Sequence, residues 1–132
     1  MNVNIDVIFK KLDCNNAKKE QQEGILLAME IKHLSVFFQP IEGKNLWENC
    51  ARIISSKNDI ELKPYICKMF EWLQDMNWPG ADIIYERLML FPSVDIEDYY
   101  KVCLNLAKSN GDNAWYSSLN DFWNSKNSRE SA

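Results

Sequence analysis

The chain has 132 residues and a formal net charge of −4, with 46% hydrophobic and 26% charged residues. This length fits one domain with a substantial core, and only four glycines and four prolines leave little room for the tight turns of an all-β fold. The acidic balance argues against nonspecific nucleic-acid binding and weakly favours a basic protein partner. No apolar run approaches the roughly 20 residues that span a bilayer, so we expect no membrane partner.

The first residues lack the basic region and the long apolar region of a signal peptide. We therefore expect a cytoplasmic protein with reduced thiols. Besides Cys14, the chain has Cys50, Cys67 and Cys103, which each lie in an apolar helical stripe and predict core thiols without a disulfide. Because His33 is the single histidine and no close ligand spacing occurs, we expect no metal site and no cofactor.

The N-terminal third predicts two helices. An apolar stripe predicts a short helix over 4–12, and a second helix is expected from about 17 to about 31. Gly24, in the middle of the second helix, indicates a kink or close packing. One more turn is expected over 33–38, before Pro40.

The clearest helical pattern lies in residues 62–80, LKPYICKMFEWLQDMNWPG. Apolar residues recur at helical spacing as far as Met76, and Asn77 and Trp78 then break the pattern. Because Pro79 fixes its own φ, it can begin a second helix, and the segment predicts an αα-hairpin. The stripes on either side of this corner predict a shared core of Leu62, Ile66, Met69, Leu73, Ile84 and Leu88.

Further apolar stripes predict helices over 45–55, from Pro79 to about 91, over 95–109 and over about 112–123. Asp59 is placed to cap the helix that contains the central segment, and Asp95 to begin the 95–109 helix. Val102 and Leu106 are expected on the buried side of the 95–109 helix. The polar residues after the last helix predict a frayed end.

The sequence also contains an internal repeat. Asp59-Ile60-Glu61 aligns with Asp95-Ile96-Glu97 at an offset of about 36 residues, which indicates two repeated helix pairs. One pair cannot hide its apolar face alone, so stacked pairs would share a core. We therefore predict an all-α fold of about seven helices, with antiparallel pairs stacked as a short HEAT-like α-α superhelix. The tetratricopeptide signature is absent, and an irregular helical bundle is the alternative.

These patterns predict a single helical domain over 1–132. Its expected parts are N-terminal capping helices over 1–43, two helix-pair repeats over 44–110, a C-terminal helix over 111–125 and a frayed tail over 126–132.

The run from Lys44 to Leu88, and above all EWLQDMNWPG at 71–80, resembles a group of small bacterial all-α proteins of largely unknown function. Similar small proteins occur as immunity proteins beside polymorphic or contact-dependent toxins. The resemblance covers about residues 44–110 and implies an α-α superhelical fold more firmly than it implies a function.

Trp78 is expected at the corner between two helices, either as a packing wedge or as an exposed anchor for a partner. Glu71, Asp75, Asp82 and Glu86 surround it in the sequence. These carboxylates form either an ordinary solvated surface or an acidic ridge that meets a basic partner. The five residues are the predicted partner-binding site.

No catalytic constellation is visible in the sequence. The carboxylates at 95, 97 and 98 are explained by the helix dipole, and neither a Ser-His-Asp set nor a glycine-rich phosphate loop occurs. We therefore expect a non-enzyme, an immunity protein that is monomeric outside its complex and occludes the basic active site of a cognate toxin domain, such as a nuclease. The alternatives are a HEAT-like adaptor without a toxin partner and a small hydrolase that uses a carboxylate pair.

Overall fold

The computed structural model describes residues 4–131, which form α-helices and short 3₁₀ helices and contain no strand. Seven of these helices span seven residues or more, and α4 is a single turn. The all-α fold expected from the sequence is confirmed. The helices are α1 (Ile5–Leu12), α2 (Lys18–Ala28), η1 (Leu34–Phe37), η2 (Lys44–Leu46), α3 (Trp47–Ser55), α4 (Asp59–Leu62), η3 (Lys63–Tyr65), α5 (Ile66–Trp72), α6 (Ala81–Met89), α7 (Ser93–Ser109) and α8 (Asn113–Ser131).

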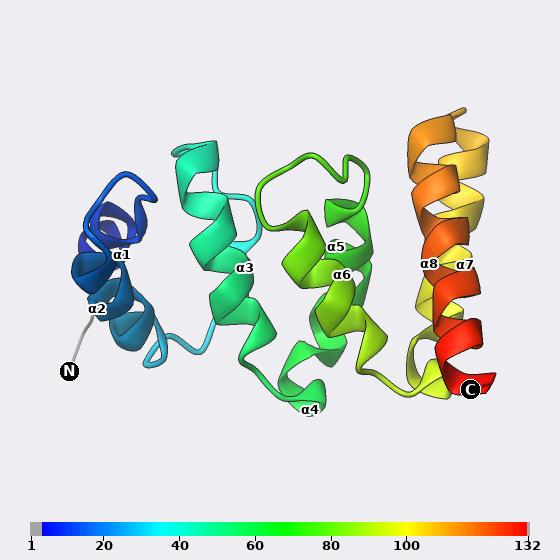
Figure 1. Ribbon diagram of the computed structural model, residues 1–132, viewed down its shortest axis with the longest axis horizontal. Helices are drawn as coiled ribbons and strands as arrows, with labels where there is room; N and C mark the ends of the chain where they lie inside the picture. The colour runs from blue at the N-terminus through cyan, green and yellow to red at the C-terminus, as the bar shows by residue number, and fades with distance from the viewer. Residues whose placement is uncertain (1–3, 132) are drawn as a thin grey trace.

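The helices stand side by side along the long axis of the molecule, with α1 and α2 at one end and α7 and α8 at the other (Figure 1). In one layer α3 packs against α6, and α6 packs against α8. In the second layer α5 packs against α7. Corresponding helices of successive pairs are therefore neighbours, as the stacking of repeated pairs requires.

The helix boundaries give the repeat a spacing of 34 residues. α3 begins at Trp47 and α6 at Ala81, and α4 begins at Asp59 and α7 at Ser93. The offset of about 36 taken from the sequence is two residues too long. It pairs Asp59 with Asp95, whereas α7 starts two residues before Asp95.

The predicted core is confirmed, and its six residues are at most 1% exposed. Met76, by contrast, is 38% exposed, because α5 ends at Trp72 and leaves Met76 in the following loop. Val102 and Leu106 are also exposed, contrary to the prediction. Cys103 and Ala107 mark the side of α7 that is buried.

The predicted helix over 62–76 is divided into α4, η3 and α5. Asn58, rather than Asp59, caps α4: its side chain accepts a 2.8 Å hydrogen bond from the backbone N–H of Glu61. The Glu61 carboxylate accepts in return from the Asn58 N–H, which completes a capping box. The Asp59 carboxylate is thereby left to pair with Arg87, 2.5 Å away.

The structure tests one prediction at each end of the chain, the packing at Gly24 and the length of the last helix. A Cβ atom on Gly24 would lie 2.8 Å from the Cβ of Lys11, so Gly24 allows α2 to pack tightly against α1. At the other end α8 continues to Ser131, well past Trp123, where the sequence predicts its end. The tail predicted to be frayed is therefore helical as far as Ser131, and Ala132 lies outside the described residues.

Candidate functional site

The loop between α5 and α6 is closed by the residues that make its sequence distinctive. The indole Nε1 of Trp72 donates a 3.1 Å hydrogen bond to the carbonyl oxygen of Pro79. Gly80 follows with φ +86°, and a Cβ atom there would lie 2.7 Å from the Cβ of Ala51. The left-handed Gly80 reverses the chain, so α6 begins at Ala81 rather than at Pro79 as the sequence predicts.

Trp78 is half-buried and packs on α3. Its ring lies nearly perpendicular to that of Trp47, with the centroids 5.8 Å apart, and Trp47 in turn contacts the ring of Trp72. The Trp47 indole N–H donates to the carbonyl oxygen of Pro40 at 2.9 Å. Trp78 thus takes part in an aromatic cluster that fastens the loop to α3.

The structure brings together some of the predicted partner-binding residues but not all of them. Asp82 and Glu86, both exposed on α6, line one groove with Ser55 of α3. Asp75 does not line this groove: it lies in the α5–α6 loop, before the lining residue Met76, and accepts a 2.8 Å hydrogen bond from the backbone N–H of Asn77. Glu71 is on α5, where its charge acts on Cys103 of α7, so it belongs to the other layer.

The groove between α3 and α6 has a volume of about 520 Å³ and an apolar side formed by Met76, Ile83 and Tyr85. Arg129 of α8 reaches Glu86 with two hydrogen bonds, of 3.0 and 3.2 Å. These bonds lower the pKa of the Glu86 carboxyl group and keep it ionised. Arg129 was not among the predicted site residues, because it lies in the tail that was predicted to be frayed.

A second groove, of about 570 Å³, lies between α4 and the first turns of α7. It is edged by Ile60, Val94 and the carboxylates of Asp95 and Asp98. This site was not predicted from the sequence, because the helix dipole explained the carboxylates at 95 and 98 and no pattern indicated that Ile60 and Val94 face solvent.

Residues 46–132 match a domain of unknown function, DUF5071. The chain belongs to this family. The match begins at the end of η2 and contains every helix from α3 to α8, so it extends beyond the 44–110 range of the resemblance. The helices α1, α2 and η1 precede the DUF5071 domain. No curated protein and no solved structure matches the chain.

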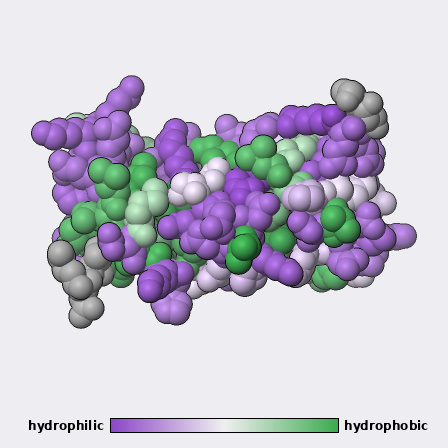
Figure 2. All heavy atoms as spheres, turned by 90° about the horizontal axis from the view of Figure 1, so that it is seen from below, coloured by the Kyte–Doolittle hydropathy of each residue, from purple (hydrophilic) through white to green (hydrophobic). Residues whose placement is uncertain are grey.

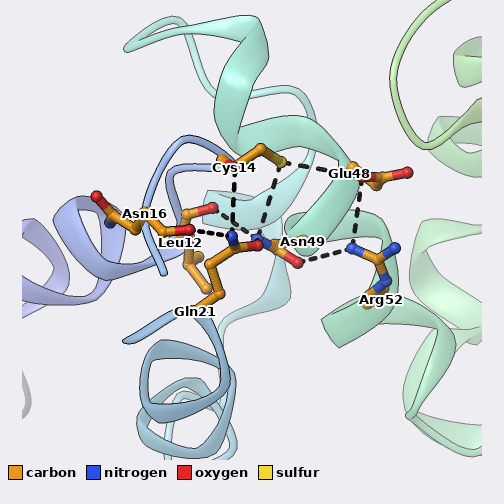
Figure 3. A network of polar contacts seen from close by, with 7 residues as sticks. All are labelled: Leu12, Cys14, Asn16, Gln21, Glu48, Asn49 and Arg52. Carbon is orange, nitrogen blue, oxygen red and sulfur yellow. Dashed lines mark hydrogen bonds and ion pairs between the residues drawn. The ribbon is translucent and has the colours of Figure 1, made fainter. Parts of the chain in front are cut away.

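A buried polar network joins the N-terminal helices to the DUF5071 domain. Asn49 of α3 is 1% exposed, and its Nδ2 donates to the carbonyl oxygen of Leu12 at 2.7 Å and to Gln21 Oε1 at 2.9 Å. Arg52 completes the arrangement by donating to Asn49 Oδ1 at 2.8 Å. Figure 3 shows these side chains converging between the α1–α2 loop and α3. All the polar atoms of the Asn49 amide are engaged within the protein, which indicates a structural rather than a ligand-binding network.

Cys14 borders this network, with its Sγ 3.9 Å from Glu48 Oε2. Partial desolvation and the nearby Glu48 carboxylate raise the pKa of the Cys14 thiol. Burial raises the pKa of Cys50 and of Cys103 to about 12. All four thiols are free, as predicted. The thiols with a raised pKa, those of Cys14, Cys50 and Cys103, therefore remain protonated near neutral pH and are poor nucleophiles.

Within residues 4–131, no three His, Cys, Asp or Glu side chains are grouped so that they could hold a metal ion. In the same part of the chain, no helix combines the length and the apolar character needed to cross a membrane. The α3–α6 and α4–α7 grooves both lie within the DUF5071 domain.

Proposed function

We propose that this DUF5071 protein is an immunity-type inhibitor, which binds a cognate bacterial toxin domain and covers a basic active site such as that of a nuclease. The observation that supports the proposal is the α3–α6 groove, where carboxylates lie beside one exposed and two half-buried apolar side chains. A groove of this composition can both attract a cationic surface and bury apolar area against it.

The charges of this face suit such a partner. No cation in residues 4–131 lies within ion-pair distance of Asp82, so its carboxylate is available to a partner. Glu86 is held in place by Arg129, and a partner arginine can share it at the edge of the groove. Met76, Ile83 and Tyr85 supply the apolar area, since contacts that exclude water carry most of the affinity of a protein interface.

The test is co-expression with the C-terminal domain of the protein that the neighbouring upstream gene encodes, scored as rescue of growth. We expect the wild type to restore growth and the Asp82→Asn/Glu86→Gln double variant to restore it poorly. Glu20→Gln, which removes an exposed carboxylate on α2, is the matched control and should rescue like the wild type. Absence of rescue and of binding by the wild-type protein would reject the proposal.

A second candidate is a HEAT-like adaptor that joins proteins without inhibiting a toxin. The 34-residue spacing of α3 and α6, and of α4 and α7, supports it, because stacked helix pairs commonly present extended binding faces. The two candidates differ in one simple result. An adaptor should bind its partner and leave the growth of toxin-expressing cells unchanged.

A further inference from the structure

Two aliphatic side chains face solvent at corresponding positions of the repeat. Ile60 is 85% exposed and Val94 is 84% exposed. They are separated by the same 34 residues as the starts of α4 and α7. Two residues after each of them, Leu62 and Ile96 are fully buried. The outward positions are therefore a consequence of the helix geometry in both units, and no described part of the chain covers them.

Ile60 and Val94 stand at the edges of the α4–α7 groove, which also contains Ile66, Phe91 and Tyr99. Figure 2 shows the molecule from the side on which α4 lies, with apolar side chains among polar ones. A single exposed aliphatic residue is ordinary on a protein surface. A pair that borders a groove with buried apolar side chains is instead typical of a protein-binding site.

The α7 side of the groove is negatively charged. Asp95 and Asp98 are exposed one turn apart, and no cation in residues 4–131 lies within ion-pair distance of either. Asp59 differs, because the buried Arg87 already pairs with it. Lys63 is the remaining charged lining residue and lies on the α4 side. Open carboxylates attract a cationic side chain and repel the phosphates of nucleic acids and anionic lipids.

We propose that the α4–α7 groove docks a short segment of a partner protein in which an aliphatic side chain lies next to a lysine or arginine. The aliphatic side chain would contact Ile60 and Val94, and the cationic group would reach Asp95 and Asp98. This groove shares no residue with the α3–α6 groove. The inference is therefore independent of the toxin and applies equally if the protein is an adaptor.

Phage-displayed random dodecapeptides provide a defined probe. They are selected on the wild-type protein and counter-selected on the Asp95→Asn/Asp98→Asn variant. We expect enriched peptides to contain lysine or arginine beside leucine, isoleucine or valine. Synthetic copies should bind Val94→Ser, and separately the double variant, about tenfold more weakly than the wild type. Asp82→Asn, in the other groove, is the control and should bind them unchanged.

The exposed positions of these side chains allow the variants to keep the native fold, which circular dichroism can verify. Amide chemical-shift changes on addition of an enriched peptide should centre on α4 and the first turns of α7, and added salt should weaken binding. Selection that yields no basic-aliphatic peptide would overturn the proposal. So would peptides that bind Val94→Ser and the double variant as tightly as the wild type, or shift changes confined to other helices. Growth rescue in the toxin assay is a separate result and decides only the proposed function.

Discussion

Lys126 of α8 donates a hydrogen bond of 3.0 Å to the carbonyl oxygen of Met89, the last residue of α6. The same ammonium group donates to the carbonyl oxygen of Phe91 in the α6–α7 turn. Its side chain is 3% exposed, and Glu130 lies one turn further along α8 at 3.3 Å. Carbonyl groups at the end of a helix have no partner within that helix, so a buried lysine satisfies them and holds the last helix in place.

We expect Lys126→Met to lower the free energy of unfolding by about 1–3 kcal/mol, because two carbonyl groups would lose their donor in a buried position. Lys108→Met is the matched control, since Lys108 is exposed near the end of α7 and makes no such contact; it should change stability little. Urea unfolding followed by tryptophan fluorescence measures both. Equal stability of the two variants would show that the Lys126 contacts contribute nothing.

The fold was more predictable than the ends of its helices. Apolar residues at helical spacing identified each helix of seven residues or more except α2, because these helices bury one side in a shared core. A helix was expected at α2 as well, although α2 buries only Gly24 and Ala28. The extent of α8 could not be read in this way. After Trp123 its sequence is polar, and its helical structure depends on contacts of Lys126, Arg129 and Glu130 with residues about 40 positions earlier.

Gly80 and Gly111 provide a matched pair of glycine substitutions. Both have positive φ, +86° and +67°, but a Cβ would meet Ala51 and the Trp47 carbonyl oxygen at Gly80 and nothing within 4 Å at Gly111. Gly111→Ala should cost about 1–2 kcal/mol for the left-handed conformation alone. Gly80→Ala should cost a further 1–3 kcal/mol or so for overpacking. Thermal and urea unfolding compare them, and equal losses would contradict the close approach of α6 to α3.

Leu73 and Met76, which both follow the last residue of α5, test which side chains of this segment belong to the core. Leu73 is fully buried, whereas Met76 is 38% exposed, although both fit the same apolar stripe in the sequence. Leu73→Ala should lower the free energy of unfolding by about 2–5 kcal/mol. Met76→Ala should lower it by less than about 1 kcal/mol, because a surface substitution removes few contacts. Comparable losses in urea unfolding would mean that Met76 is buried like Leu73.

The candidate site was predictable only in part. Asp82 and Glu86 were identified because they are four residues apart on a helix, a spacing that places them on one face. Glu71 fits the same run of sequence, but it lies on α5 in the other layer. The α4–α7 groove joins Ile60 to Val94 across 34 residues, and such a pairing becomes visible only when the stacking of the helices is known.

Alkaline pH should destabilise the fold. Burial raises the pKa of Cys50 and of Cys103 from 9.0 to about 12, and that of the Tyr100 phenol from 10.0 to about 12. When the pH lies between the pKa of the unfolded chain and the raised pKa of the folded chain, these groups lose their protons in the unfolded chain and retain them in the folded chain. The contribution of these three groups to the free energy of unfolding should therefore be constant below about pH 9 and fall as the pH rises towards about 12. Urea unfolding across this range, in the presence of a reductant, measures the slope.

The Cys50→Ala/Cys103→Ala variant separates this effect from general alkaline denaturation. It should be less stable than the wild type near neutral pH, because buried volume is lost. Its stability should nevertheless fall less steeply above about pH 9, since two of the groups that cause the slope have been removed. A slope equal to that of the wild type would show that the thiols do not contribute.

Salt should act on the rate at which the protein associates with a toxin domain. If the carboxylates of the α3–α6 groove attract a basic partner, association should slow markedly as salt shortens the screening length from about 8 Å at 0.15 M to about 3 Å at 1 M. The Asp75→Asn/Asp82→Asn/Glu86→Gln variant should associate more slowly at low salt and respond less to added salt. If Trp78 also contacts the partner, Trp78→Phe, which keeps an aromatic ring against Trp47, should change mainly the dissociation rate, because short-range contacts with the partner determine how long a complex persists. Stopped-flow mixing across a salt series measures these rates. An association rate that changes neither with salt nor with the three carboxylate substitutions would exclude the α3–α6 groove as the electrostatic contact. The partner would then bind another surface of the molecule.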